Sequence, residues 1–419
     1  MGLFSWYTKI PLPILVVLYL IAGLAIGYTF PTSEVTKALF ISGTYFPKTI
    51  VTFAALLIFN LLAAAMAKLM LFHKGKAGKM FGLIFGTYVT MGLISLVYVT
   101  FWLLGLTDIP YVLPGVETPG PMAWLAQIGH TFANVLTQQP LLQALCGAVV
   151  VGWLAGKYPV LHPIAHGFIA VGDGILWFFK KLLWYYPIMI GCLAMGIPMK
   201  FGAKGMALYG EGVLWVAIVT LTWVCLMILS CKLVTKRSWK QIISYYGAVW
   251  PTGFGTGGSY DTLAVNIISA ERDLGLRPDV AEVSIVFGTV LNKNCSTMSV
   301  LICTVIVSKL LGIPISLTEI LMLIPPVMIL GLESPGIPGG AGYFMSPIIA
   351  VLLNAPDQSV YVTTFVSVFS GLVPMFSTAG NTTDDGVVGA LLQDRFGHYI
   401  GGHEEPAMAM ECANEKGGA

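Results

Sequence analysis

Charge is what this sequence has least of. Only 10% of its 419 residues are Asp, Glu, Lys or Arg, whereas 56% are hydrophobic. Soluble domains carry about 25% charged residues, so the composition predicts a polytopic membrane protein rather than a soluble domain. The formal net charge is +2, and no basic run is interleaved with aromatic residues. We therefore expect the lipid bilayer and a small-molecule solute as partners, and no nucleic acid.

Paired cysteines and metal-binding motifs are also missing. None of the seven cysteines forms a CxxC pair, and six of them lie in apolar segments. This pattern predicts small packing residues rather than disulfides or metal ligands. The six histidines include no HExxH spacing, and no nucleophile–base set is evident. We therefore expect neither an enzyme nor an organic cofactor.

Long apolar stretches dominate what is present. A helix needs about 20 apolar residues to cross the hydrocarbon core. Eight stretches qualify, at 10–29, 47–71, 80–105, 133–156, 167–199, 207–234, 281–311 and 360–393. Two further stretches, 240–275 and 317–354, each contain a Gly/Pro-rich break between two apolar halves, which predicts re-entrant helical hairpins. Because one crossing separates them, we expect the hairpins to enter from opposite faces as an inverted repeat.

Loop charge predicts the orientation. Lysine and arginine cluster after the second and after the sixth predicted span. Positively charged loops stay on the cytoplasmic side. We therefore expect the N-terminus and the polar tail to be cytoplasmic.

Two of the apolar segments carry polar residues at their middle. Phe287–Ile302 contains Asn292-Lys-Asn-Cys-Ser296, and Phe376–Leu392 contains Asn381-Thr-Thr-Asp-Asp385. A charged side chain at membrane depth costs about 2.5–3.5 kcal/mol, so such residues mark a functional site. We expect both segments to be interrupted helices. Gly/Pro-interrupted apolar segments in corresponding positions point to the binding site of a transporter.

These residues resemble the sodium-coupled glutamate/aspartate and dicarboxylate symporters. The order of hairpin, broken span, hairpin and broken span is the same. Gly336-Ile-Pro-Gly-Gly-Ala-Gly342 is similar to the second hairpin tip of that family. Asn292–Ser296 resembles its Asn-Met-Asp-Gly-Thr motif, and Asn381–Asp385 resembles its Asn-x-x-x-Asp motif. The resemblance implies an all-α, eight-span fold of the elevator type and a homotrimer.

The resemblance also implies a division into domains. Residues 1–79 and 133–206 would form a static scaffold, whereas 80–132 and 207–399 would belong to a moving transport domain. The polar tail, 400–419, would follow.

The same resemblance implies two sets of site residues. Solute-binding residues would be Ser259, Ser334, Gly336, Ser377, Thr378 and Asn381. Residues for cation or proton coupling would be Gly288, Asn292, Lys293, Asn294, Glu333, Asp384 and Asp385. Sodium would bind at Gly288, Asn292 and Asp385.

Four positions depart from the family pattern. The arginine that pairs with an acidic solute side chain falls on Ser377, and the aspartate that holds the solute amine falls on Pro374. The methionine of the first motif falls on Lys293, and the aspartate after it falls on Asn294. An acidic side chain in a buried site requires a partner such as arginine. We therefore expect weak or no transport of glutamate and aspartate.

These observations predict a secondary active transporter in the plasma membrane. Its solute would be a small polar organic molecule, an amino acid or an organic acid, moved by an elevator mechanism. A cation gradient, with Na⁺ or H⁺ as the coupling ion, would drive it. Because Lys293 replaces a sodium-site residue, transport would be proton-coupled or sodium-independent. The alternatives are a sodium-coupled dicarboxylate or glutamate symporter of the usual kind, and a channel-like pore.

Overall fold

The computed structural model describes most of the chain as helix. The described residues are 7, 10, 12–72, 77–106, 109–114, 122–123, 126, 129–130, 133, 137, 140–182, 185–334, 336 and 338–400. Within these ranges every regular element is helical. The prediction of an all-α protein is therefore confirmed. The predicted tail beyond residue 400 and most of the predicted external loop between 106 and 127 lie outside the described residues.

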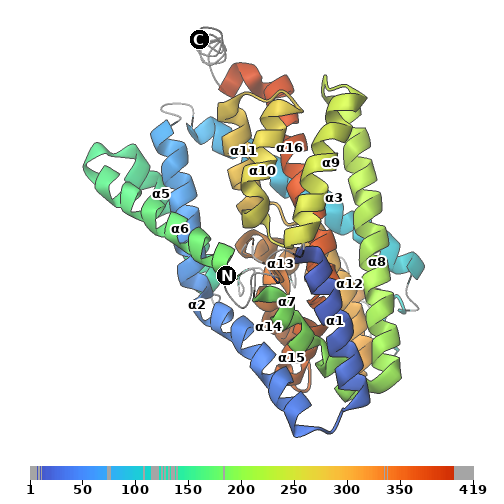
Figure 1. Ribbon diagram of the computed structural model, residues 1–419. Coiled ribbons are helices and arrows are strands. Elements are labelled where there is room, and N and C mark those ends of the chain that lie inside the picture. The colour runs from blue at the N-terminus through green and yellow to red at the C-terminus, as the bar shows by residue number, and fades with distance from the viewer. Residues whose placement is uncertain are drawn as a thin grey trace, which may run out of the picture.

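The helices of the first half of the chain, with one exception, pack on one another. They are α1 (Leu12–Thr29), α2 (Glu34–Phe72), α3 (Ala77–Leu106), α5 (Pro140–Lys157), the 3-10 helix η2 (Pro159–Leu161), α6 (His162–Leu182) and α7 (Tyr186–Ala194). Of these, α2 packs against α5 and α6, and α1 packs against α7. Figure 1 shows α5 and α6 beside α2, away from the centre of the molecule. In contrast, α3 packs against the helices of the second half.

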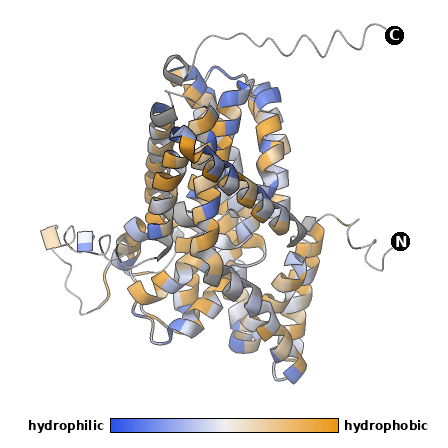
Figure 2. Ribbon diagram, turned by 90° about the vertical axis from the view of Figure 1, so that its left-hand side faces the viewer, coloured by the Kyte–Doolittle hydropathy of each residue, from blue (hydrophilic) through white to orange (hydrophobic). Residues whose placement is uncertain are grey.

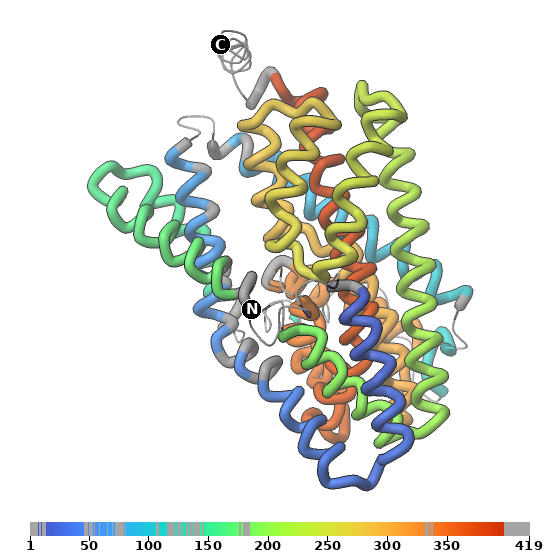
Figure 3. Tube along the Cα trace, viewed as in Figure 1, coloured from blue at the N-terminus to red at the C-terminus, as the bar shows by residue number. Residues whose placement is uncertain are grey.

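The second half of the chain surrounds one central helix. Its elements are α8 (Gly196–Val234), α9 (Trp239–Thr256), α10 (Ser259–Arg272), α11 (Pro278–Leu291), α12 (Asn294–Leu311), α13 (Leu317–Glu333), α14 (Gly340–Leu352), α15 (Gln358–Phe369) and α16 (Leu372–Ile400). The central helix is α16, which packs against α8, α9, α11 and α12. Figure 3 shows α9 and α10 in the upper half of the molecule and α14 and α15 in the lower half.

The expected span at 167–199 is divided in the structure. Helix α6 ends at Leu182, and α7 begins again at Tyr186. Pro187 stands in the first turn of α7. A proline suits that position because the first N–H groups of a helix have no intrahelical acceptor. Both pieces pack on α2, but α6 also packs on α5, whereas α7 packs chiefly on α1.

Several helices suit a membrane by length and composition. Among the described residues, three helical stretches qualify as spans: Phe81–Gly105, Gly196–Val234 and Pro278–Leu311. A fourth span would be formed by α15 and α16, which are bent by 67° relative to one another. Figure 2 shows apolar residues along the helices and hydrophilic residues gathered toward their ends. The chain is an α-helical membrane protein, and the number of eight spans stays a prediction.

Both predicted hairpins are present as helix pairs whose tips meet. Gly257, with φ of 62°, ends α9 in the left-handed region, which glycine adopts without strain. Gly339, with φ of 74°, stands directly before α14. The backbone N–H of Tyr260 in the first tip donates to the carbonyl oxygen of Gly336 in the second tip, at 3.1 Å. The two Gly-rich breaks therefore face each other in the interior.

One predicted helix break is confirmed and the other is wrong. The break at Asn292 and Lys293 separates α11 from α12, as the sequence predicts. In contrast, α16 continues without interruption through Asn381–Asp385. The break in that segment comes earlier, at Ser370 and Gly371, where the φ of the glycine is 77°. Asn381, Asp384 and Asp385 of α16 bond to neighbouring helices, whereas the hydroxyls of Thr382 and Thr383 donate to carbonyl oxygens one turn earlier in α16 itself. All of these polar side chains therefore have partners while the helix stays continuous.

Candidate functional site

Asn381 joins α16 to the break between α11 and α12. Its Oδ1 accepts the backbone N–H of Cys295 at 2.8 Å, and its Nδ2 donates to Oγ of Ser296 at 2.8 Å. Its backbone carbonyl accepts Nδ2 of Asn292 at 2.7 Å. The first N–H groups of a helix lack intrahelical acceptors. Asn381 supplies one to α12, and this holds the break in one position.

Asp385 lies one turn further along α16, where three elements meet. Its Oδ1 accepts Nδ2 of Asn292 at 2.8 Å and the hydroxyl of Tyr88, on α3, at 3.3 Å. Gly288 faces this carboxylate so closely that a Cβ would collide with Asp385 and with Tyr88. The structure thus brings together Gly288, Asn292 and Asp385, the residues for which the sequence predicts cation binding. Carboxylate and carbonyl oxygens are the ligands of hard cations such as Na⁺.

Asp384 points toward a different neighbour. Its Oδ2 accepts the indole N–H of Trp223, on α8, at 2.9 Å and Nδ2 of Asn294 at 3.2 Å. The two adjacent carboxylates are both fully buried, yet they bond to separate sets of donors. Trp223 and Tyr88 were not predicted as site residues. Nothing in the sequence marks them, because aromatic residues occur throughout the apolar segments.

Lys293 lies in the break itself and is 4% exposed. Its Nζ donates to the carbonyl oxygen of Thr289 at 2.6 Å and to that of Asn292 at 3.3 Å. These carbonyls belong to the C-terminal end of α11, and a helix C-terminus favours a cation. Among the described residues, no carboxylate oxygen lies within 4.0 Å of the ammonium. The cation is therefore held by backbone oxygens rather than by a direct ion pair.

A small cavity lies between the two hairpin tips, α12 and α16. Its volume is about 10 Å³, which is the room of one water molecule. The described residues that line it are Ser259, Lys293, Ser296, Ser334, Gly336, Gly339, Gly340, Ala341, Phe369, Pro374, Thr378 and Asn381. Five of the predicted solute-binding residues therefore surround one space. Ser296 and Phe369 join them, and neither was predicted to bind solute.

Ser377 is the predicted solute residue that does not line this cavity. Its Oγ lies 2.8 Å from Oγ of Ser299 and donates to the carbonyl oxygen of Val373 at 2.7 Å. The hydroxyl of Thr378, the next residue, donates to the carbonyl oxygen of Gly257 at 2.8 Å. Successive side chains of a helix project on different faces, so Ser377 and Thr378 meet different partners. The side chain of Glu333, predicted for coupling, lies outside the described residues.

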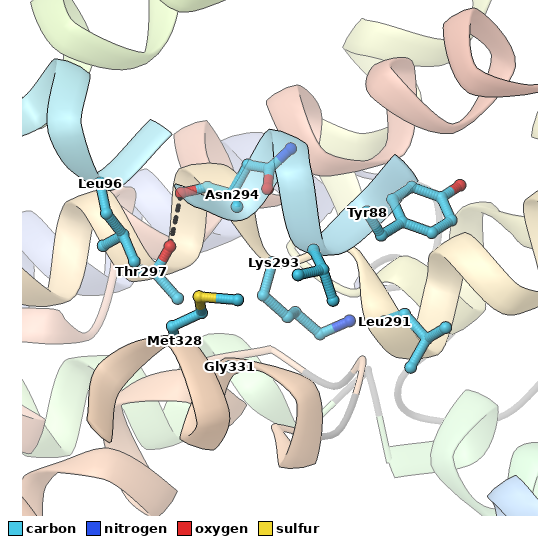
Figure 4. Close-up of a pocket in the computed structure, with 10 residues that line it drawn as sticks. Tyr88, Leu96, Leu291, Lys293, Asn294, Thr297, Met328 and Gly331 are labelled. Carbon is cyan, nitrogen blue, oxygen red and sulfur yellow. Dashed lines mark hydrogen bonds between the residues drawn. The ribbon is translucent and has the colours of Figure 1, made fainter. Parts of the chain in front are cut away.

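A second cavity lies on the other side of Lys293. It has a volume of about 20 Å³ and is lined by Tyr88, Asn294, Thr297, Met328 and Gly331, among others. Figure 4 shows the Lys293 side chain extending away from Thr297 and Met328 and toward Leu291. Lys293 lines both cavities, so it stands between them.

The sequence pattern that describes the sodium:dicarboxylate symporter family matches residues 12–395. The chain belongs to the sodium:dicarboxylate symporter family. It is also similar to a protein of Onchocerca volvulus that is named as an excitatory amino acid transporter, with 23% identity over 208 residues. That similarity covers 48% of this chain and 42% of the relative, which is less than half of its length. The predicted family is confirmed, and the chain is an integral membrane protein of that family.

Proposed function

We propose that this protein is a secondary active transporter for a small polar organic solute, an amino acid or an organic acid. Lys293 takes the place of a coupling cation in it. The observation that carries the proposal is the ammonium of Lys293, bonded to the carbonyl oxygens of Thr289 and Asn292. Asp385, the carboxylate of the predicted sodium site, lies on α16 beside the same break. A resident ammonium supplies the single positive charge that sodium would bring.

A fixed cation is energetically favourable at this break. An isolated buried charge is costly, but the cost falls when opposite charges lie in the same buried region. Lys293 and Asp385 are both at most 4% exposed and flank the same break. With Lys293 in place, a sodium ion would add a second positive charge beside the first. Transport would therefore be proton-coupled or passive, and independent of sodium.

The packing supports an elevator mechanism. Helices α2, α5 and α6 pack on one another, whereas α8–α12 and α15 pack on α16, and α13 and α14 pack on α12. This second group contains the solute cavity. The second group can then move as a unit along the first and carry the solute with it. The homotrimer and the plasma-membrane location remain part of this proposal through family membership.

The basic ends of the helices support the predicted orientation. The C-terminal ends of α2 and α8 lie at the same end of the molecule, the upper end in Figure 1. Lys68 lies near the first of these ends, and Lys232 and Arg237 lie at the second. Basic residues at one end indicate the cytoplasmic side. The first hairpin would then open to the cytoplasm and the second to the outside.

A second candidate is a sodium-coupled dicarboxylate or glutamate symporter of the usual kind. Family membership favours it, and so does the cluster of Gly288, Asn292 and Asp385. The two candidates differ in what Lys293 does. In the first candidate the ammonium of Lys293 replaces the sodium ion. In the second candidate the ammonium would have to release the carbonyl oxygens of Thr289 and Asn292 so that sodium could bind.

Counterflow in proteoliposomes tests the transport function itself. Vesicles would be loaded with unlabelled L-alanine, L-lactate, L-aspartate or succinate, and uptake of the same labelled compound would be followed. For at least one of the compounds other than L-aspartate, we expect saturable uptake that accelerates when the same solute is present inside. Uptake without such acceleration, rising linearly with concentration, would indicate a pore and contradict the proposal.

A further inference from the structure

The cavity between the hairpin tips is lined by positive charge and by no negative charge among the described residues. Among its described lining residues Lys293 is the only ionisable one, and none is acidic. Pro374 forms part of the wall and offers no charge to a solute. The ammonium lies beside the second tip. It donates to the carbonyl oxygen of Thr289. The same oxygen lies 3.3 Å from the position that a Cβ would take on Gly336.

Helix ends add to the positive character of this cavity. Ser259 is the first residue of α10, and Gly340 is the first residue of α14. Ser296 lies in the first turn of α12. All three line the cavity. The N-terminus of a helix carries a partial positive charge and N–H groups without intrahelical acceptors, so it favours an anion.

Two side chains at the cavity, Ser334 and Lys293, each have a hydrogen-bond donor without an acceptor. The hydroxyl of Ser334 is 2% exposed and has no hydrogen-bond partner, although it lines the cavity. An unsatisfied buried polar group costs about 1–3 kcal/mol, so such a group indicates a missing partner. An ammonium has three N–H donors. Lys293 uses two of them on backbone carbonyls, which leaves one for a solute.

We propose that the transported solute is a short-chain organic monocarboxylate without an ammonium group. This inference rests on the proposed transport function and specifies its solute. The carboxylate accepts from Lys293 and from the hydroxyl of Ser334, with the helix N-termini of α10 and α14 around it. Phe369, Pro374 and Ala341 provide an apolar wall for a short carbon chain.

The same charges reject two related classes of solute. The ammonium of an amino acid would meet Lys293 and three positive helix ends, with no lining carboxylate among the described residues to bind it. A dicarboxylate would bring a second negative charge for which these residues supply no second cation. Because a buried charge without a partner is costly, both classes bind less tightly than a monocarboxylate.

Binding to the purified full-length protein separates these classes without any mutation. The probes are L-lactate, L-alanine, L-lactamide and succinate, measured by thermal unfolding and by calorimetric titration. Alanine carries an ammonium where lactate carries a hydroxyl, and lactamide lacks the negative charge. We expect lactate to raise the unfolding temperature and to bind at least about tenfold more tightly than the other three, as expected for one charge-assisted hydrogen bond.

Two variants assign the effect to one residue. Lys293→Met should weaken lactate binding about tenfold or more. Lys309→Met is the matched control, because Lys309 lies in the last turn of α12, the helix that Lys293 precedes, faces Glu211 at 3.8 Å and lines neither cavity. Lactate affinity should be unchanged in it.

The inference can fail while the transport proposal stands. Alanine or succinate binding as tightly as lactate, or lactate not binding at all, would overturn the monocarboxylate assignment. Counterflow of alanine or succinate would then show that the transporter carries a different solute. The comparison of probes on the wild-type protein remains decisive even if Lys293→Met does not fold.

Discussion

The ammonium of Lys293 lies 2.6 Å from the carbonyl oxygen of Thr289, one helical turn earlier in the chain. The bond closes the last turn of α11 with a side chain instead of a backbone N–H, because the helix ends at Leu291. Backbone carbonyls at a helix C-terminus lack intrahelical donors. In this protein the ammonium of Lys293 supplies a donor to one of these carbonyls. The break in this segment therefore carries its own positive charge.

Gly288 should not tolerate even one methyl group. A Cβ at this position would collide with the carboxylate of Asp385 and the hydroxyl of Tyr88. We expect Gly288→Ala to lower the free energy of unfolding by about 1–3 kcal/mol, through overpacking, and to reduce transport. Gly92→Ala is the control, because the nearest atom to its Cβ would be Oδ1 of Asn294 at 3.8 Å. Equal stability of the two variants in denaturant titrations would refute this reading of the site.

The second hairpin tip should act as the gate. The cavity of about 10 Å³ is too small for an organic solute, so some part of its wall must move. We expect the tip between Ser334 and Gly342 to move, because several of its residues are glycines and loops that close over a site commonly act as gates. A cysteine at Gly340 should react with an impermeant thiol reagent added outside and should be protected by solute. The φ of 74° at Gly339 makes that neighbour a poorer site for the substitution.

The control for the gate uses a position outside the tip and outside the lining of the cavity. Val360 is 39% exposed near the start of α15. A cysteine there should react equally with and without L-lactate. The exposed native residues Cys146 and Cys225 would first be replaced by serine in both proteins. If Gly340→Cys also reacts equally in both states, the gate lies elsewhere.

Replacing Ser377 with arginine should not create a binding site for aspartate. Its side chain is fully buried and faces Ser299 on α12 rather than the cavity. We expect micromolar aspartate not to inhibit uptake by the wild type. Ser377→Arg should lower the unfolding temperature sharply without creating aspartate inhibition, because it buries an unpaired charge. Ser377→Ala should retain uptake. Aspartate-sensitive uptake in the arginine variant would show that this face of α16 does reach the solute.

Much of the fold follows from local signals in the sequence. Gly257 and Gly339 mark both hairpin tips because each adopts a positive φ that other residues resist. The polar run at Asn292 and Lys293 ends α11, as expected from residues that cannot all be satisfied within one apolar helix. These signals act over a few residues, so one sequence is enough to identify them.

The rest depends on partners that are distant in the chain. Asn381 and Asp385 look like a helix break in the sequence, yet their side chains bond to Cys295, Ser296 and Asn292, and α16 stays continuous. The hydrogen bond from the indole N–H of Trp223 to Asp384 joins residues that are 161 positions apart in the chain. The direction of Ser377 likewise depends on α12. Only the packed structure determines which polar residues face the cavity and which face a neighbouring helix.

The most direct test of the account is the ion requirement of uptake. Proteoliposomes containing the wild type or Lys293→Met would take up labelled solute in sodium, potassium or choline buffer, with and without a pH gradient. With the ammonium in the place of the ion, the wild type should transport equally in all three buffers. Sodium dependence gained by Lys293→Met would be the strongest support. Wild-type uptake that requires sodium and saturates with its concentration would contradict the central claim.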